Sequence, residues 1–194
     1  VVTGGNSAGD FLRLLGNGED FGLNQMHYTY QKTEGGIADA LALAEHFVGD
    51  DKVVVILGDN FVQGSIRAAV ENFGQQAEGA KIFLKEVDNP RDFGVAELDG
   101  DRVVRIIEKP KDPPSNLAVI GIYMYDKRVF EICNSLEPSA RGELEITDVN
   151  NDYISRGTMT YEVLEGWWAD CGSFDALIRS NVLVAREHGV NPKP

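Results

Sequence analysis

Apolar strand-like runs alternate with amphipathic segments through the first half of the chain, and this alternation constrains the fold most. The continuous Val/Ile/Leu run at 52–57 predicts a strand covered on both faces. Apolar residues in 36–48 recur at the helical period and predict a helix. The remaining segments predict strands at 26–31 and 80–87 and helices at 7–15 and 65–76. Such repetition is typical of a parallel sheet with right-handed crossovers.

The second half departs from this rhythm. Asp99-Gly100-Asp101, flanked by alternating Val and Ile, predicts a β-hairpin over 94–108. We expect further strands at 117–125 and 158–164 and helices at 129–136, 145–156 and 174–188. We therefore predict an α/β fold with a doubly wound, Rossmann-like mixed sheet and a small hairpin excursion. The 194 residues are enough to bury one core, so we expect one domain spanning 1–194.

Composition excludes several classes of partner. The net charge of −13 argues against binding to nucleic acid or an anionic membrane, both of which need a basic face. The longest apolar run, 117–125, is far shorter than the ~20 residues of a membrane helix. Two cysteines cannot form a disulfide framework, so we expect a reducing compartment, the cytoplasm.

The first residues are unusual for the start of a protein. Val1-Val2-Thr3-Gly4-Gly5 contains no Met and no charged or apolar leader. This segment resembles the end of a strand whose beginning is missing. We therefore expect a chain truncated at its N-terminus, without a signal peptide.

Two acidic residues are candidates for a metal site. Asp59 directly follows the most apolar strand, and ligands of doubly wound sheets bind beyond the carboxyl ends of strands. Asp170 lies in a loop between two tryptophans and Gly172. Mg²⁺ needs only one or two carboxylates besides substrate phosphates, so this pair would suffice. The alternatives are a turn residue for Asp59 and a helix cap at Ser173 beside Asp170.

Other polar residues have the chemistry of phosphate, hydroxyl or base contacts. Lys109 and Arg141 suit phosphates, and Glu108 can accept hydroxyl groups. Gln31 lies between a strand and a helix, where an amide can bind a base edge. For each of these residues, a solvated surface position is the alternative.

Taken in order, the motifs of the chain resemble those of the sugar nucleotidyltransferases. The motifs are Val-Thr-Gly-Gly, Gln-x4-Gly-Ile-Ala-Asp-Ala, Leu-Gly-Asp-Asn, Phe-Gly-Val, Glu-Lys-Pro, Arg-Gly-Glu-Leu-Glu-Ile-Thr-Asp-Val-Asn and Trp-x-Asp-x-Gly. The resemblance extends over essentially the whole chain, and it implies the fold of nucleotide-diphospho-sugar transferases.

The resemblance also implies roles for individual residues. It places Gln31 and Gly36 at the pyrimidine base, Asp59 and Asp170 on Mg²⁺, Gly94 and Glu108 at the sugar, Lys109 and Arg141 at the sugar 1-phosphate, and Val119 in the hexose pocket. The implied reaction is attack of glucose 1-phosphate on the α-phosphorus of dTTP, which expels pyrophosphate. Asp59, Lys109 and Arg141 would contribute through positioning and charge neutralisation. A homodimer or homotetramer is also implied.

The chain lacks the opening signature of that family, a Gly-rich loop with an Arg and a downstream Lys after the first strand. In the family this strand is central, so its absence predicts two unpaired sheet edges. The missing loop leaves open an inactive scaffold that binds a nucleotide sugar or a partner subunit. An enzyme that uses UTP also stays open, because thymine and uracil present the same imide edge, and so does an unrelated phosphatase with an Asp at a strand tip.

Overall fold

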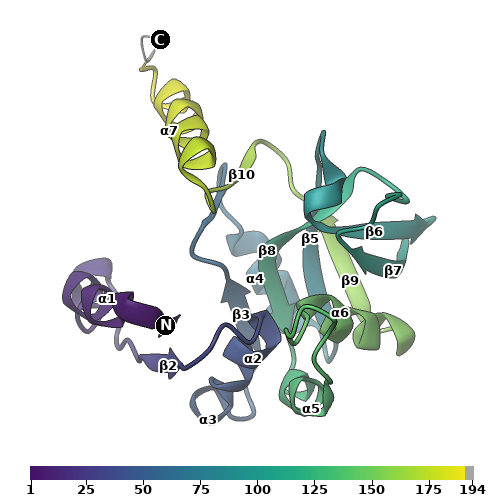
Figure 1. The fold of residues 1–194 in the computed structure, drawn as a ribbon, viewed down its shortest axis with the longest axis horizontal. Helices are drawn as coiled ribbons and strands as arrows, with labels where there is room; N and C mark the ends of the chain where they lie inside the picture. The colour runs from purple at the N-terminus through teal and green to yellow at the C-terminus, as the bar shows by residue number, and fades with distance from the viewer. Residues whose placement is uncertain (191–194) are drawn as a thin grey trace. The chain divides into compact units, whose positions relative to one another are not determined.

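The computed structural model describes residues 1–190, apart from the side chain of Asn6 (Figure 1). The chain forms two compact units. Unit 1 comprises Val1–Lys52 and Lys127–Asp152, and unit 2 comprises Val53–Asp126 and Tyr153–Pro194. No helix in the described part of the chain is long and apolar enough to cross a membrane. A single domain over the whole chain stays a prediction.

Unit 1 combines a small parallel sheet with several helices. Its elements are β1 (Val2–Gly4), α1 (Ala8–Leu15), β2 (Thr29–Gln31), α2 (Ile37–Ala42), α3 (Glu45–Val48), α5 (Arg128–Ser135) and the first part of α6 (Ile146–Ser155), with short 3-10 helices at Gly5–Ser7 and Glu19–Phe21. β1 and β2 pair in parallel. α2 packs against α5, which buries Leu41 on α2 and Val129 on α5.

Two predicted elements of unit 1 differ in extent. The helix expected at 36–48 is divided into α2 and α3, because Ala44 N–H donates to Leu41 O and tightens the turn between them. The strand expected at 26–31 is reduced to β2, which pairs with the three residues of β1. A short partner strand thus limits the length of β2.

Unit 2 is built on a mixed sheet. The strands of the mixed sheet are β3 (Val53–Ile56), β5 (Ala80–Glu86), β6 (Gly94–Asp99), β7 (Arg102–Glu108), β8 (Leu117–Tyr125) and β9 (Met159–Val163). Two short strands, β4 (Asn60–Val62) and β10 (Trp168–Asp170), form a separate pair. The helices of unit 2 are α4 (Arg67–Gln75) and α7 (Phe174–Glu187), with a 3-10 turn at Pro90–Asp92. The strand order is β7-β6-β8-β5-β9, and β3 also pairs with β8. Only the β5–β9 pair of this sheet is parallel. Figure 1 shows β8, β5 and β9 running side by side.

This topology confirms the mixed α/β fold but corrects two details. The parallel pairing expected in the first half of the chain is wrong for β3 and β5, because β8 lies between them and is antiparallel to both. β3 is also not covered on both faces: Val54 and Ile56 are 36% and 55% exposed. Among the described strands β3 pairs with β8 alone, so it has few neighbours to cover it.

The two faces of β8 have different neighbours. Ile120, Ile122 and Met124 pack with Phe73 of α4 and Phe83 of β5 in the core of unit 2. Successive side chains of a strand point to opposite faces, so Val119, Gly121 and Tyr123 share the other face. On this second face, Gly121 lies against the side chain of Asn60, the residue that follows Asp59.

Candidate functional site

A short strand pair brings the two predicted metal ligands together. β4 and β10 are antiparallel, with Asn60 opposite Asp170, and Cys171 N–H donates to Asp59 O at 2.8 Å. A Cβ added at Gly172 would lie 3.1 Å from Asp170 Oδ1 and 3.5 Å from Asp59 Oδ2. Both carboxylates therefore face one small space, which glycine leaves open.

This space suits a hard divalent cation. The two half-buried carboxylates provide oxygen ligands, the type that Mg²⁺ prefers, and the exposed Gly172 leaves room for water or phosphate. Within residues 1–190 no group of three or more His, Cys, Asp and Glu side chains could hold a metal ion. A carboxylate pair fits Mg²⁺ nonetheless, because this ion usually completes its shell with water and substrate phosphates.

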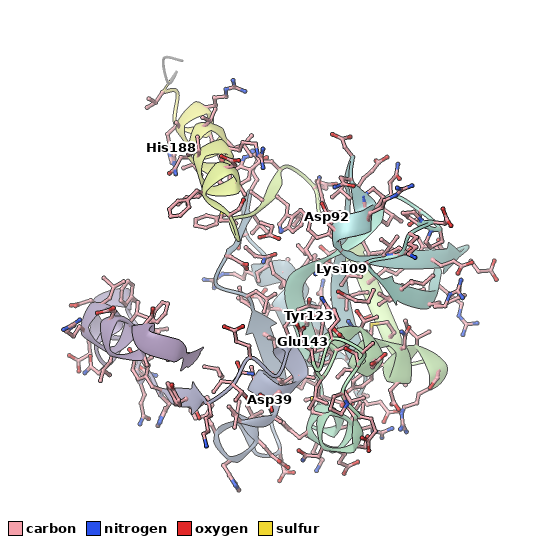
Figure 2. The ribbon with its side chains drawn as sticks, viewed as in Figure 1. Asp39, Asp92, Lys109, Tyr123, Glu143 and His188 are labelled. Carbon is pink, nitrogen blue, oxygen red and sulfur yellow. The ribbon has the colours of Figure 1, made fainter. Side chains whose placement is uncertain are left out.

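The residues expected at the sugar lie at one end of the β6–β7 hairpin and on β8. Gly94 pairs with Glu108 in the ladder, and Lys109 N–H donates to Phe93 O at 3.0 Å. Lys109 has a φ of 41°, and its side chain is exposed (Figure 2). A positive φ is unusual for a residue with a side chain, so the hairpin end imposes the backbone direction at Lys109. Val119 is buried, on the same face of β8 as Gly121 and Tyr123.

Tyr123 is a buried phenol on β8. Its side chain is buried on the same face of β8 as Val119 (labelled in Figure 2). Burial raises the pKa of Tyr123 above its usual range, and the negative charges of Glu108 and Asp59 raise it further.

In unit 1, the structure brings Gln31 and Gly36 together. Gln31 Nε2 donates to Gly36 O at 3.1 Å and to Asp39 Oδ2 at 2.7 Å. Gly36 has a φ of 96°, and a Cβ there would lie 2.5 Å from Leu144 O. Only glycine fits this position, since a side chain would be strained and would meet backbone.

The loop that carries Arg141 lies against the same glycines. Leu144 N–H donates to Gly35 O at 2.8 Å, so the loop is fixed to the segment before α2. Arg141 forms a forked ion pair with Glu145, through Nε to Oε1 at 3.1 Å and Nη2 to Oε2 at 2.7 Å. Its Nη2 also lies 3.4 Å from Glu143 Oε2. The guanidinium is thus held by carboxylates in this structure.

Comparisons with known proteins agree with this arrangement of motifs. Residues 1–187 match the Nucleotidyl transferase family. The chain belongs to this family.

Curated relatives resemble the chain over nearly its whole length. A low-salt glycan biosynthesis nucleotidyltransferase of Haloferax volcanii is 40% identical over 100% of the chain and 54% of the relative. The glucose-1-phosphate thymidylyltransferases of Neisseria meningitidis and Mycolicibacterium smegmatis are 41% and 42% identical over 91% and 95% of the chain. The chain spans 62% and 65% of those two enzymes. It therefore corresponds to somewhat more than half of these relatives.

Solved structures share the fold. A Bacillus anthracis protein described as a glucose-1-phosphate thymidylyltransferase, crystallised with sucrose, has a TM-score of 0.89 and 49% identity over all of this chain and 77% of its own. A UDP-glucose pyrophosphorylase bound to UDP-glucose has a TM-score of 0.73 and 26% identity, covering 83% of this chain and 66% of its own.

Sequence reasoning missed the roles of three residues around Asp59. Asn60 and Trp168 form the polar contacts described below, and Gly121 is the site of close approach that allows them. A Cβ at Gly121 would lie 2.5 Å from Asn60 Nδ2. The signal in the sequence was weak, because an Asn after an Asp is common in turns and a Gly inside an apolar run only suggests close packing.

Proposed function

We propose that the chain is the nucleotidyl-transferring part of a glucose-1-phosphate thymidylyltransferase. In this reaction a phosphate oxygen of glucose 1-phosphate forms a bond to the α-phosphorus of dTTP. The bond from the α-phosphorus to the bridging oxygen breaks, and pyrophosphate leaves with that electron pair. The products are dTDP-glucose and pyrophosphate. The observation that carries the proposal is the convergence of Asp59 and Asp170 beside Gly172 in a chain of this family.

Charge neutralisation is the main requirement of this reaction. Two polyanions must meet in a protein whose net charge is −13. Mg²⁺ held by Asp59 and Asp170 would supply positive charge at the phosphate oxygens. Lys109 would bind the sugar phosphate from the end of β7, where its backbone direction is imposed by the hairpin. Arg141 would bind phosphate by exchanging its Glu145 carboxylate for phosphate oxygens of similar geometry.

Gln31 and Gly36 would bind the base. Both N–H hydrogens of Gln31 Nε2 are already directed to Gly36 O and Asp39. The amide oxygen of Gln31 would therefore accept the imide N–H of the base. Thymine and uracil share this N–H, so the contact does not separate dTTP from UTP. Gly94, Glu108 and Val119 would bind the glucose ring.

A uridylyltransferase is the second candidate. The similarity to a UDP-glucose pyrophosphorylase over 83% of the chain supports it. Glucose-1-phosphate thymidylyltransferases are represented among relatives of higher identity, 41% and 42%, which favours dTTP. We extend the proposal to a cytoplasmic homo-oligomer, and two free cysteines agree with a reducing compartment.

The test is release of pyrophosphate with Mg²⁺, glucose 1-phosphate and either dTTP or UTP, by the purified protein supplied with the Gly-rich opening segment of the family. We expect release with dTTP, faster than with UTP, and a loss of at least about a hundredfold in Asp59→Asn, since an amide is a weaker ligand than a carboxylate. Faster release with UTP would favour the uridylyltransferase. Binding of dTDP-glucose without any pyrophosphate release would favour the inactive scaffold, and release of phosphate from a simple ester would favour a phosphatase.

A further inference from the structure

The side-chain amide of Asn60 lies at the centre of a hydrogen-bond network beside Asp59. Asn60 Oδ1 accepts from Trp168 Nε1 at 2.8 Å and from the backbone N–H of Gly121 at 2.9 Å. Asn60 Nδ2 donates to Asp59 Oδ1 at 2.8 Å. Three strands, β4, β8 and β10, thus contribute to the position of one amide.

These partners determine which way the amide is turned. An indole N–H and a backbone N–H can only donate, and a carboxylate oxygen accepts. The amide oxygen must therefore face Trp168 and Gly121, and the amide nitrogen must face Asp59. In the reversed orientation, the amide N–H groups would face the N–H groups of Trp168 and Gly121, and the amide oxygen would face the carboxylate of Asp59. Asn is well suited to this position, because one side needs an acceptor and the other a donor.

Packing holds the two donors in place. The Trp168 ring contacts the Phe93 ring edge to face, with centroids 5.2 Å apart. Trp168 also lies opposite Val62 in the β4–β10 ladder. At Gly121, a Cβ would lie 2.5 Å from Asn60 Nδ2 and 2.8 Å from Asn60 Cγ. The amide therefore occupies the space that a side chain at residue 121 would need.

The network has a directional effect on Asp59. Its Oδ1 is engaged by Asn60 Nδ2, while its Oδ2 is the oxygen that lies 3.5 Å from the Cβ position of Gly172. Asp170 differs, because its Oδ1 both accepts from Gly172 N–H at 2.8 Å and lies beside the Cβ position of Gly172. Each carboxylate is thus restrained through one hydrogen bond, and that of Asp59 leaves the oxygen beside the shared space free of Asn60.

We propose that Asn60 is a positioning residue, which orients the Asp59 carboxylate toward Asp170 through the bonds from Trp168 and Gly121. The proposal rests on the metal-dependent function proposed above. Hydrogen-bonded neighbours of metal ligands fix the orientation of the ligand, and their loss typically weakens metal binding about 10- to 100-fold. Loss of Asn60 should therefore weaken the binding of the divalent ion.

The test uses Mn²⁺ as a paramagnetic probe, with its dissociation constant measured by electron paramagnetic resonance in the presence of dTTP. We expect Asn60→Ala to raise this constant about 10- to 100-fold. Trp168→Phe keeps an aromatic ring against Phe93 and removes one hydrogen bond, so we expect about a two- to tenfold increase. Trp167→Phe and Asn116→Ala are the matched controls, and we expect no change in either. Thermal unfolding is measured for every variant.

The outcomes separate this inference from the function on which it rests. In one outcome, the unmodified protein binds Mn²⁺ while Asn60→Ala and Trp168→Phe have dissociation constants within twofold of its own. That result would overturn the positioning role of Asn60 and leave the proposed metal site standing. Unchanged dissociation constants together with a lowered unfolding temperature would show that Asn60 stabilises the fold without positioning Asp59. Absence of Mn²⁺ binding by the unmodified protein would overturn the proposed metal site and this inference with it. If Asn60→Ala does not fold, the Mn²⁺ dissociation constant of Trp168→Phe decides whether the network positions Asp59.

Discussion

Gly172→Ala tests the carboxylate pair with little change to the fold. The added Cβ would lie 3.1 Å from Asp170 Oδ1 and 3.5 Å from Asp59 Oδ2, and the backbone of Gly172 is not in the left-handed region. These contacts are tight but not prohibitive, so we expect the free energy of unfolding to change by less than about 1 kcal/mol. The methyl group would nevertheless fill the space that both oxygens face.

The expected effect on metal affinity follows from Coulomb's law. If the methyl group displaces a dication from about 4 to about 5 Å from one carboxylate, the attraction weakens by about 1.7 kcal/mol at an effective dielectric constant of about 20. That energy corresponds to a rise of about fifteenfold in the Mn²⁺ dissociation constant. A titration followed by electron paramagnetic resonance measures the constant, and urea unfolding measures stability.

The control for this substitution is Gly74→Ala in α4, where an added Cβ meets nothing within 4 Å. We expect it to leave Mn²⁺ binding unchanged and to stabilise the helix by about 0.5–1 kcal/mol. A Gly172→Ala protein that folds normally and binds Mn²⁺ as tightly as the unmodified protein would refute the reasoning, because the space beside Gly172 would then not be the metal site.

Three further predictions concern other parts of the chain. Arg141→Lys should raise the KM for glucose 1-phosphate about tenfold with little loss of stability, because lysine cannot form a forked contact; an unchanged KM in steady-state kinetics would argue against a phosphate role. Gly36→Ala should lower the free energy of unfolding by at least about 2 kcal/mol, because of the positive φ and the clash with Leu144 O; equal urea midpoints would contradict this. Burial raises the pKa of Cys133 to about 12, so its thiol should resist alkylation at pH 8 until urea unfolds the protein, as mass spectrometry can show.

The sequence predicted the elements of the fold better than their pairing. The strand at 52–57 and the buried strand at 117–125 were visible as continuous apolar runs, and both are present as β3 and β8. Their antiparallel pairing was not visible, because it joins segments distant in the chain and leaves no local pattern. The division of the helix expected at 36–48 depends on one tightened turn at Ala44, which helical periodicity does not detect.

The candidate site was predicted in part for similar reasons. Asp59 and Asp170 stood out because each carboxylate follows an apolar or aromatic segment, and the structure places them beside Gly172. Their approach depends on β4 and β10, whose three residues each are too short to show a strand period. The contacts of Asn60 were hidden for the same reason, since Trp168 reaches it only through that pairing.

The most direct test is a crystal structure of the protein with Mn²⁺ and dTDP-glucose, in which anomalous scattering locates the metal. Our account predicts one manganese peak bound by both the Asp59 and the Asp170 carboxylates and in contact with the diphosphate. A peak bound by neither carboxylate, or bound diphosphate without any manganese peak at this pair, would contradict it.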